Sequence, residues 1–206
     1  GDSLTIDGGT GEVIEGVVPT IDAAITDDFA TFMKWSDEYR RLGVRTNADS
    51  PEDAKVAVKF GAQGIGLTRT EHMFFEKDRI LAVREMIFAN TVTDREKALA
   101  KILPFQREDF VGIFTVLNGL PVNIRLLDPP LHEFLPHSAE DKKELAASLG
   151  LEMKSIENRG EQLHEFNPML GHRGCRLGVT FPEIYRMQVQ AIIEAALICA
   201  DKGITV

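Results

Sequence analysis

The side chains best suited to chemistry in this sequence are arginines that follow short apolar runs. Arg69 comes after Ile65-Gly-Leu67, whose glycines allow close backbone approach, and Thr70, Glu71 and His72 come next. A guanidinium offers a planar fork of hydrogen-bond donors that suits a phosphate or a carboxylate. The alternative is a structural ion pair between Arg69 and Glu71 or another acid. The residue types alone do not decide between an anion-binding arginine and a structural ion pair.

A second arginine repeats this arrangement. Apolar residues alternate along Pro121–Leu126, a strand candidate, and Arg125 lies near its end. In parallel α/β folds, ligands bind at the carboxyl ends of the strands. Arg69 and Arg125 can therefore converge on one anion. Asp128 follows, and it either caps a turn before two prolines or pairs with Arg125.

A third group of polar residues lies in the loop Asn167–Arg176, which is rich in glycine, histidine and arginine. We expect Arg173 to face an anion and Arg176 to lie on the surface. His132 and His137 are interpreted as hydrogen-bonded loop histidines, because no second cluster has the spacing of metal ligands.

Composition excludes several classes of partner. The chain has 206 residues and a formal net charge of −9, which argues against binding to nucleic acid or to an anionic membrane surface. No apolar run approaches the length of a membrane-spanning helix, and no secretory signal is recognised. Two cysteines, Cys175 and Cys199, form neither a disulfide framework nor a zinc pattern, so we expect a cytoplasmic protein, with an organelle as the open alternative.

Alternating strands and helices must position these residues. Residues 1–20 predict a β-hairpin, with strands at 4–6, 13–14 and 17–18, and Asp22–Arg41 has the pattern of a linker helix. Further strands are expected at 44–47, 64–68, 121–126 and 203–206, and helices at 50–60, 78–90, 94–103, 106–117, 140–149, 151–165 and 182–201. Pro104 is expected to separate two of these helices. The alternation predicts an α/β fold, either a parallel sheet or a barrel with outer helices. We interpret it as the N-terminal portion of a TIM-type (β/α)8 barrel, with Ile65, Leu67, Val122 and Ile124 on its inward face.

Three motifs resemble the barrel domain of the pyruvate phosphate dikinase family. They are Gly64-Ile-Gly-Leu-Thr-Arg-Thr-Glu-His-Met-Phe-Phe75, Arg125-Leu-Leu-Asp-Pro-Pro-Leu-His-Glu-Phe134 and Asn167-Pro-Met-Leu-Gly-His-Arg-Gly-Cys-Arg176. The resemblance covers essentially the whole chain. It divides the chain into the end of a phosphohistidine domain (1–20), a linker helix (21–42) and the first part of a barrel that binds phosphoenolpyruvate (PEP) or pyruvate (43–206).

The resemblance implies a reversible reaction in which ATP, pyruvate and phosphate give AMP, PEP and diphosphate through a phosphohistidine. By motif position, Arg69 and Arg125 are the substrate-binding residues that hold the phosphoryl group. Arg173 and Asn47 are implied as neighbours of that site, and the role of Arg45 is not assigned. The family implies Mg²⁺, a phosphohistidine domain in the same chain as partner, and a homodimer.

Departures from the family pattern limit what this chain is expected to do. None of the five histidines lies in the family's Gly-Gly-Met-Thr-Ser-His context. The later strands that carry the magnesium ligands and the acid are also not recognised, so no catalytic residue or metal ligand is assigned. We expect a fragment that is inactive alone. The alternatives are a stand-alone module that binds an anionic metabolite, a scaffold segment, or a fragment of a PEP synthase or enzyme I relative.

Overall fold

The computed structural model describes residues 1–206 except 22–23, 77–78, 129 and 168. Contacts divide the chain into two units, Gly1–Leu42 and Gly43–Val206. In the first unit, β1 (Leu4–Ile6) pairs antiparallel with β2 (Val13–Glu15), which confirms the hairpin, although the expected strand at 17–18 does not form. Helix α1 spans Asp27–Tyr39 and buries no residue. Its expected start at 22–23 lies outside the described residues.

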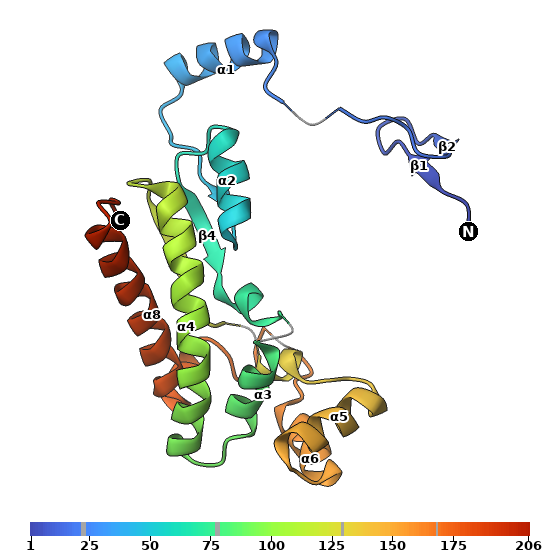
Figure 1. Ribbon diagram of the computed structural model, residues 1–206, viewed down its shortest axis with the longest axis vertical. Helices are drawn as coiled ribbons and strands as arrows, with labels where there is room; N and C mark the ends of the chain where they lie inside the picture. The colour runs from blue at the N-terminus through green and yellow to red at the C-terminus, as the bar shows by residue number, and fades with distance from the viewer. Residues whose placement is uncertain (22–23, 77–78, 129, 168) are drawn as a thin grey trace. The chain divides into compact units, whose positions relative to one another are not determined.

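The second unit alternates strands and helices (Figure 1). Its elements are β3 (Thr46–Asn47), α2 (Pro51–Lys59), β4 (Ile65–Arg69), the 3-10 helix η1 (Thr70–Phe74), α3 (Ile80–Phe88), α4 (Val92–Leu117), β5 (Val122–Arg125), the 3-10 helix η2 (Leu131–Phe134), α5 (Ala139–Leu149), α6 (Met153–Leu163), α7 (Cys175–Thr180) and α8 (Pro182–Asp201). The strands form a parallel sheet in the order β3-β4-β5. This confirms the α/β class, while the sheet in the described part of the chain is not closed into a barrel.

Local signals in the sequence account for several helix starts. Ser50 accepts a hydrogen bond from the backbone N–H of Asp53 at 3.1 Å, and Pro51 occupies the first turn of α2. Ser138 caps α5 in the same way through Asp141, at 3.0 Å. The helix α7 was not expected, and its first two residues, Cys175 and Arg176, lie in the glycine-rich segment that was predicted to be a loop.

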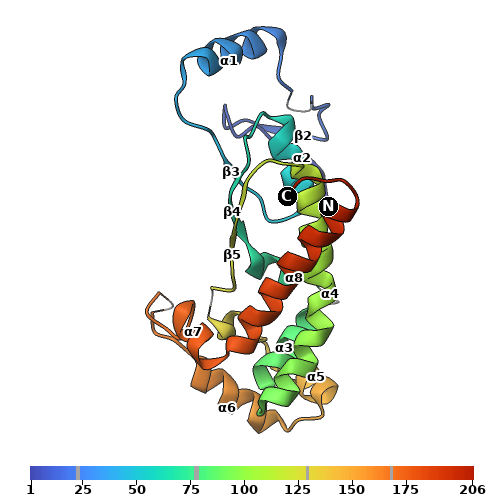
Figure 2. The ribbon, with the colours of Figure 1, turned by 90° about the vertical axis from the view of Figure 1, so that its left-hand side faces the viewer.

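The separation of two helices at Pro104 is wrong, because α4 runs unbroken through this residue. A proline inside a helix loses one backbone hydrogen bond and costs about 3 kcal/mol. That cost is offset by burial on both sides of the proline, where Ile102 and Phe110 are almost fully buried in two different cores. Helices α4 and α8 lie side by side along this length (Figures 1 and 2).

The described residues form two large hydrophobic cores and a small one between α5 and α6. One includes Phe74, Leu127, Phe134 and residues of α3, α4 and α8. The other joins β4 to α2, α4 and α8, and it includes Ile65, Phe110 and Cys199, all with no exposed surface. Cys199 is thus a core residue of α8.

The expectation that Ile65, Leu67, Val122 and Ile124 form one inward face is wrong. Ile65 is fully buried in the core that contains α4 and α8, and Val122 and Ile124 pack against that core. Leu67 is only half-buried. The register of β4 against β5 shifts between Ile65 and Thr68, so the simple alternation of faces fails there.

The expected strand at 203–206 does not form either. Its backbone hydrogen bonds are used elsewhere: Ile204 donates to Cys199 O at 2.9 Å, and Gly119 donates to Thr205 O at 2.8 Å. These bonds hold the segment at the turn before β5. Among the described residues, no helix combines the length and the apolar character that a bilayer crossing requires.

Candidate functional site

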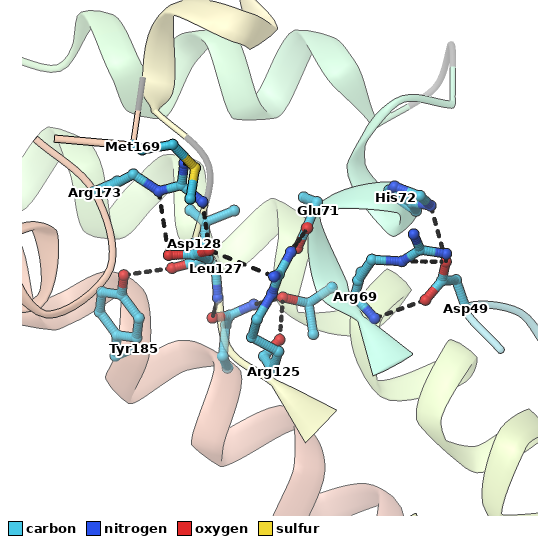
Figure 3. Close-up of polar contacts among 12 residues, drawn as sticks. Asp49, Arg69, Glu71, His72, Arg125, Leu127, Asp128, Met169, Arg173 and Tyr185 are labelled. Atoms are coloured by element: carbon cyan, nitrogen blue, oxygen red, sulfur yellow. Dashed lines mark hydrogen bonds and ion pairs between the residues drawn. The ribbon is translucent and has the colours of Figure 1, made fainter. Parts of the chain in front are cut away.

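The two predicted arginines are brought together by the sheet. Arg69 is the last residue of β4, Arg125 is the last residue of β5, and the two are register partners in this parallel pair. Their side chains keep 36% and 38% of their surface exposed, so solvent and small ligands reach both. The strand ends therefore place two guanidinium groups on one edge of the sheet, as the sequence predicts (Figure 3).

Arg69 pairs with Asp49, which lies two residues after the end of the neighbouring strand β3. Its Nε and Nη2 atoms donate to Asp49 Oδ2 at 2.9 and 2.6 Å, and its backbone N–H donates to Oδ1 at 2.7 Å. His72 Nδ1 lies 2.9 Å from the same Oδ2. Partial burial opposes ionisation, yet the hydrogen bonds from Arg69 hold the pKa of Asp49 below its ordinary value of 3.8. The structural ion pair considered for Arg69 thus forms, with Asp49 in place of Glu71.

Arg125 pairs with Glu71 and Asp128. Nη2 of Arg125 donates to Oε1 of the buried Glu71, and Nη1 lies 3.5 Å from Asp128 Oδ2. Two buried atoms of this pair, Arg125 Nε and Glu71 Oε2, have no hydrogen-bond partner within the described residues. The pairing therefore leaves hydrogen-bonding capacity on both side chains.

Arg173 is also at this edge. Its Nη2 donates to Asp128 Oδ2 at 2.6 Å, and its Nε lies 3.4 Å from Oδ1 (Figure 3). This contact, opposed by partial burial, lowers the pKa of Asp128 from its ordinary value. Asp128 joins Arg125 to Arg173, so it is an ion-pair partner of both. We call Arg69, Arg125 and Arg173 the arginine cluster.

The charges of the arginine cluster are matched by carboxylates. Asp49, Glu71 and Asp128 provide one negative charge for each guanidinium. Sequence reasoning missed Asp49, although its position directly after β3 follows the same rule that identified Arg69 and Arg125. An anion that binds here must share the guanidinium donors with these acids.

The other residues singled out in the sequence are not members of the arginine cluster. Asn47 ends β3 and is exposed, as is Arg45, and Arg176 is exposed as expected. His132 lies in η2, with a buried Nδ1 that finds no partner in the described chain. A surface cavity of about 740 Å³ is lined there by His132, His137, His164, Lys142, Glu157 and Glu161, among others.

The described residues do not fit a metal ion. No group of three or more His, Cys, Asp or Glu side chains among them could hold one. The Mg²⁺ implied by the family resemblance therefore has no ligand set among the described residues.

Two residues of α8 that sequence reasoning missed contact the segment between Arg125 and Asp128. Gln188 Oε1 accepts the backbone N–H of Leu127 at 2.8 Å. The hydroxyl of Tyr185 donates to Leu127 O at 2.5 Å (Figure 3). Both residues were part of a helical pattern that indicated only an apolar face. The signal that could have found Gln188 is an amide on the buried side of that helix.

Comparisons with known proteins point to one family. The family model described as "PEP-utilising enzyme, PEP-binding domain" matches residues 23–204. The pyruvate, phosphate dikinase of Giardia intestinalis is 59% identical over the whole chain, which covers 23% of that protein. The dikinase of Rhizobium meliloti (strain 1021) is 55% identical over the whole chain and 23% of its own length. That of Clostridium symbiosum is 52% identical over 96% of the chain and 22% of its own length. The chain thus spans less than a quarter of these curated relatives.

Proposed function

Because the chain belongs to the PEP-utilising enzymes, through their PEP-binding domain, we propose that it forms part of the PEP and pyruvate site of a longer pyruvate, phosphate dikinase. In that enzyme, ATP, phosphate and pyruvate would be converted reversibly to AMP, diphosphate and PEP. Arg69 and Arg125 would hold the phosphoryl group as it passes between a phosphohistidine and the enolate oxygen of pyruvate. Relatives that carry this name at 52–59% identity favour an enzyme over a stand-alone binding module.

The observation that carries the proposal is the register of Arg69 and Arg125. Both close their strands at the carboxyl edge of a parallel sheet, opposite one another. This is the edge at which α/β folds bind ligands. Two guanidinium groups fixed in advance at one edge can neutralise the charge on phosphoryl oxygens without reorganising during the reaction.

The existing ion pairs leave donors for such a group. Asp49 uses Nε and Nη2 of Arg69, so this pairing does not engage Nη1. On Arg125, Nη1 lies 3.5 Å from Asp128 Oδ2, which is too long for a strong hydrogen bond, so this atom can turn to a ligand. A guanidinium carries five N–H donors, so a carboxylate and a phosphoryl group can share it. The acids then orient the arginines while leaving part of each fork for substrate.

The sheet and the first unit would also belong to domains of this longer enzyme. Strands β3, β4 and β5 would begin a (β/α)8 barrel whose carboxyl edge carries the site. Residues 1–20 would end the phosphohistidine domain, and residues 21–42 would form the linker to the barrel. The phosphohistidine domain of the same chain would then be the partner of this edge, and two copies of the full-length protein would form a homodimer.

The test uses Arg69→Ala and Arg125→Ala in the full-length protein. Each change should slow PEP formation from pyruvate by a factor on the order of 10² to 10³, the effect of removing one preorganised donor. ATP-dependent phosphorylation of the protein should continue, because that step uses a different site.

Arg107→Ala is the matched control. Arg107 has 35% of its side chain exposed and pairs with Glu194 at 2.7 Å, yet this pair joins α4 to α8 and lies apart from the strand ends. The control should keep normal activity. Near-normal PEP formation in either Arg69→Ala or Arg125→Ala would contradict the assignment of that residue.

A further inference from the structure

The backbone of Leu127 is held by side chains of α8. Strand β5 ends at Arg125, so the sheet provides no ladder partner for the fully buried Leu127. Gln188 Oε1 accepts the N–H of Leu127 at 2.8 Å. The Tyr185 hydroxyl donates to the carbonyl of Leu127 at 2.5 Å (Figure 3). Residues 185 and 188 are one turn apart on the same face of the helix. The N–H and the carbonyl of Leu127 are thus both held by hydrogen bonds, which fixes the segment that joins Arg125 to Asp128.

Gln188 also reaches the end of β4. Its Nε2 donates to Thr70 Oγ1 at 3.0 Å, and Thr70 Oγ1 donates to the carbonyl of Arg125 at 2.9 Å. Gln188 and Thr70 have no exposed surface. One buried amide therefore links the residue after Arg69 to the backbone of Arg125 and Leu127. Hydrogen bonds in such a closed network are costly to break, because each freed group stays buried.

Tyr185 extends this link to the third arginine. Its hydroxyl lies 3.0 Å from the carbonyl of Gly174, the residue after Arg173. Both neighbours of the hydroxyl are carbonyl oxygens, which only accept hydrogen bonds, so the phenol must keep its proton. Burial raises the pKa of Tyr185 to about 12, in agreement with this role. The hydroxyl joins the backbone beside Arg173 to the backbone between Arg125 and Asp128.

We propose that Gln188 and Tyr185 are positioning residues, which fix the backbone from which the arginine cluster extends and thereby set the affinity of the site for a phosphorylated substrate. The inference rests on the proposed function, because it assigns a substrate-binding role to the arginine cluster. Neither residue touches the substrate. Their effect is transmitted through Thr70, Leu127 and Gly174.

A purely structural role would give a different kinetic result. If these bonds only stabilise the fold, their loss lowers the fraction of folded enzyme and reduces kcat in proportion. The KM of the remaining folded molecules then stays the same. Misplaced arginines instead weaken contacts with the substrate, and a displacement of about 1 Å can cost on the order of 10²-fold in rate. The KM for PEP separates the two roles.

The variants are Gln188→Met and Tyr185→Phe in the full-length protein, assayed for pyruvate formation from PEP. Both are close in shape to the original residue and remove the hydrogen bonds. We expect the KM for PEP to rise by about tenfold or more for Gln188→Met and less for Tyr185→Phe, with a fall in kcat. An unchanged KM in both variants would overturn the proposal.

Gln106→Met is the matched control. Gln106 is a buried glutamine of α4, 1% exposed against 0% for Gln188, and its Nε2 lies 3.6 Å from the sulfur of Met73. Gln106→Met replaces a buried amide with a thioether, as Gln188→Met does. Because Gln106 Oε1 is buried and has no partner among the described residues, the control should change thermal stability little and leave the KM for PEP unchanged. An equal rise in KM for Gln106→Met would also overturn the proposal.

Hydrogen exchange of the ligand-free protein tests the link itself, apart from the proposed function. Peptides that cover 66–74 and 122–128 should exchange faster in Gln188→Met and Tyr185→Phe, and at the normal rate in Gln106→Met. Unaltered exchange in Gln188→Met would overturn the link, and faster exchange with a normal KM would overturn its role in substrate affinity. Near-normal PEP formation in Arg69→Ala and Arg125→Ala would instead refute the proposed function, whatever the exchange result.

Discussion

The carboxyl edge of the sheet and the core beneath it are stabilised by different kinds of interaction. Under the sheet, Ile65, Phe110 and Cys199 pack together with no exposed surface. At the edge, Arg69 and Arg125 are more than a third exposed and are held by directed bonds to acids. Water does not compete for the apolar contacts of the core. An ion pair at a solvent-exposed edge, in contrast, can exchange one partner for another at a low cost in free energy. The difference suits a rigid support beneath an edge that accepts an anion.

The largest expected effect is a loss of stability in the core. Phe110→Ala removes a fully buried ring between α4, β4 and α8 and should lower the free energy of unfolding by about 3–5 kcal/mol. Amide exchange of α4 in the full-length protein measures this loss. Val189→Ala on the exposed side of α8 is the control and should change stability by less than about 0.5 kcal/mol. Similar values for the two variants would break the comparison between core and edge.

A smaller effect on stability is expected at the edge. Asp49→Asn removes the charge opposite Arg69 and can keep an oxygen for the Arg69 backbone N–H. We expect a stability loss of about 1 kcal/mol or less, because the pair is partly exposed. The uncompensated guanidinium should bind inorganic phosphate more tightly, by about threefold to fivefold, which corresponds to a gain of less than about 1 kcal/mol. Calorimetry measures both quantities, and weaker phosphate binding would show that Asp49 mainly orients Arg69.

The sequence predicts the core and the strand ends for the same physical reason. Periodic apolar residues and caps such as Ser50 are local signals, and they place β4, β5 and α8 close to their observed bounds. Pro104 was misleading because a local rule was overridden by packing along the whole of α4. The partner of Arg69 was also missed, because Asp49 lies 20 residues away in sequence and meets Arg69 only through the pairing of β3 with β4. Gln188 is 118 residues from Thr70, which no periodicity could reveal.

Acid should weaken the edge before it affects the apolar core. The pKa values of Asp49 and Asp128 are lower in the folded protein than their ordinary value of 3.8. Below pH 3.8, the unfolded chain therefore binds more protons than the folded protein does. These two groups add stability that is fully present above pH 3.8 and is lost as the pH falls below it. Urea unfolding between about pH 5 and pH 2.5 follows this loss. The double variant Asp49→Asn with Asp128→Asn should show a flatter dependence, and an unchanged slope would contradict the role of these pairs.

The central claim is that Arg69 and Arg125 bind the same phosphoryl group, and a double-mutant cycle on PEP affinity tests it most directly. The dissociation constant of PEP would be measured in the full-length protein for Arg69→Ala, Arg125→Ala and the double variant. Two residues that share one ligand should show a coupling energy of about 1 kcal/mol or more. The cycle of Arg69→Ala with Arg107→Ala should be additive within about 0.5 kcal/mol. Additivity in the Arg69 and Arg125 cycle, or unchanged PEP affinity in either single variant, would contradict the account.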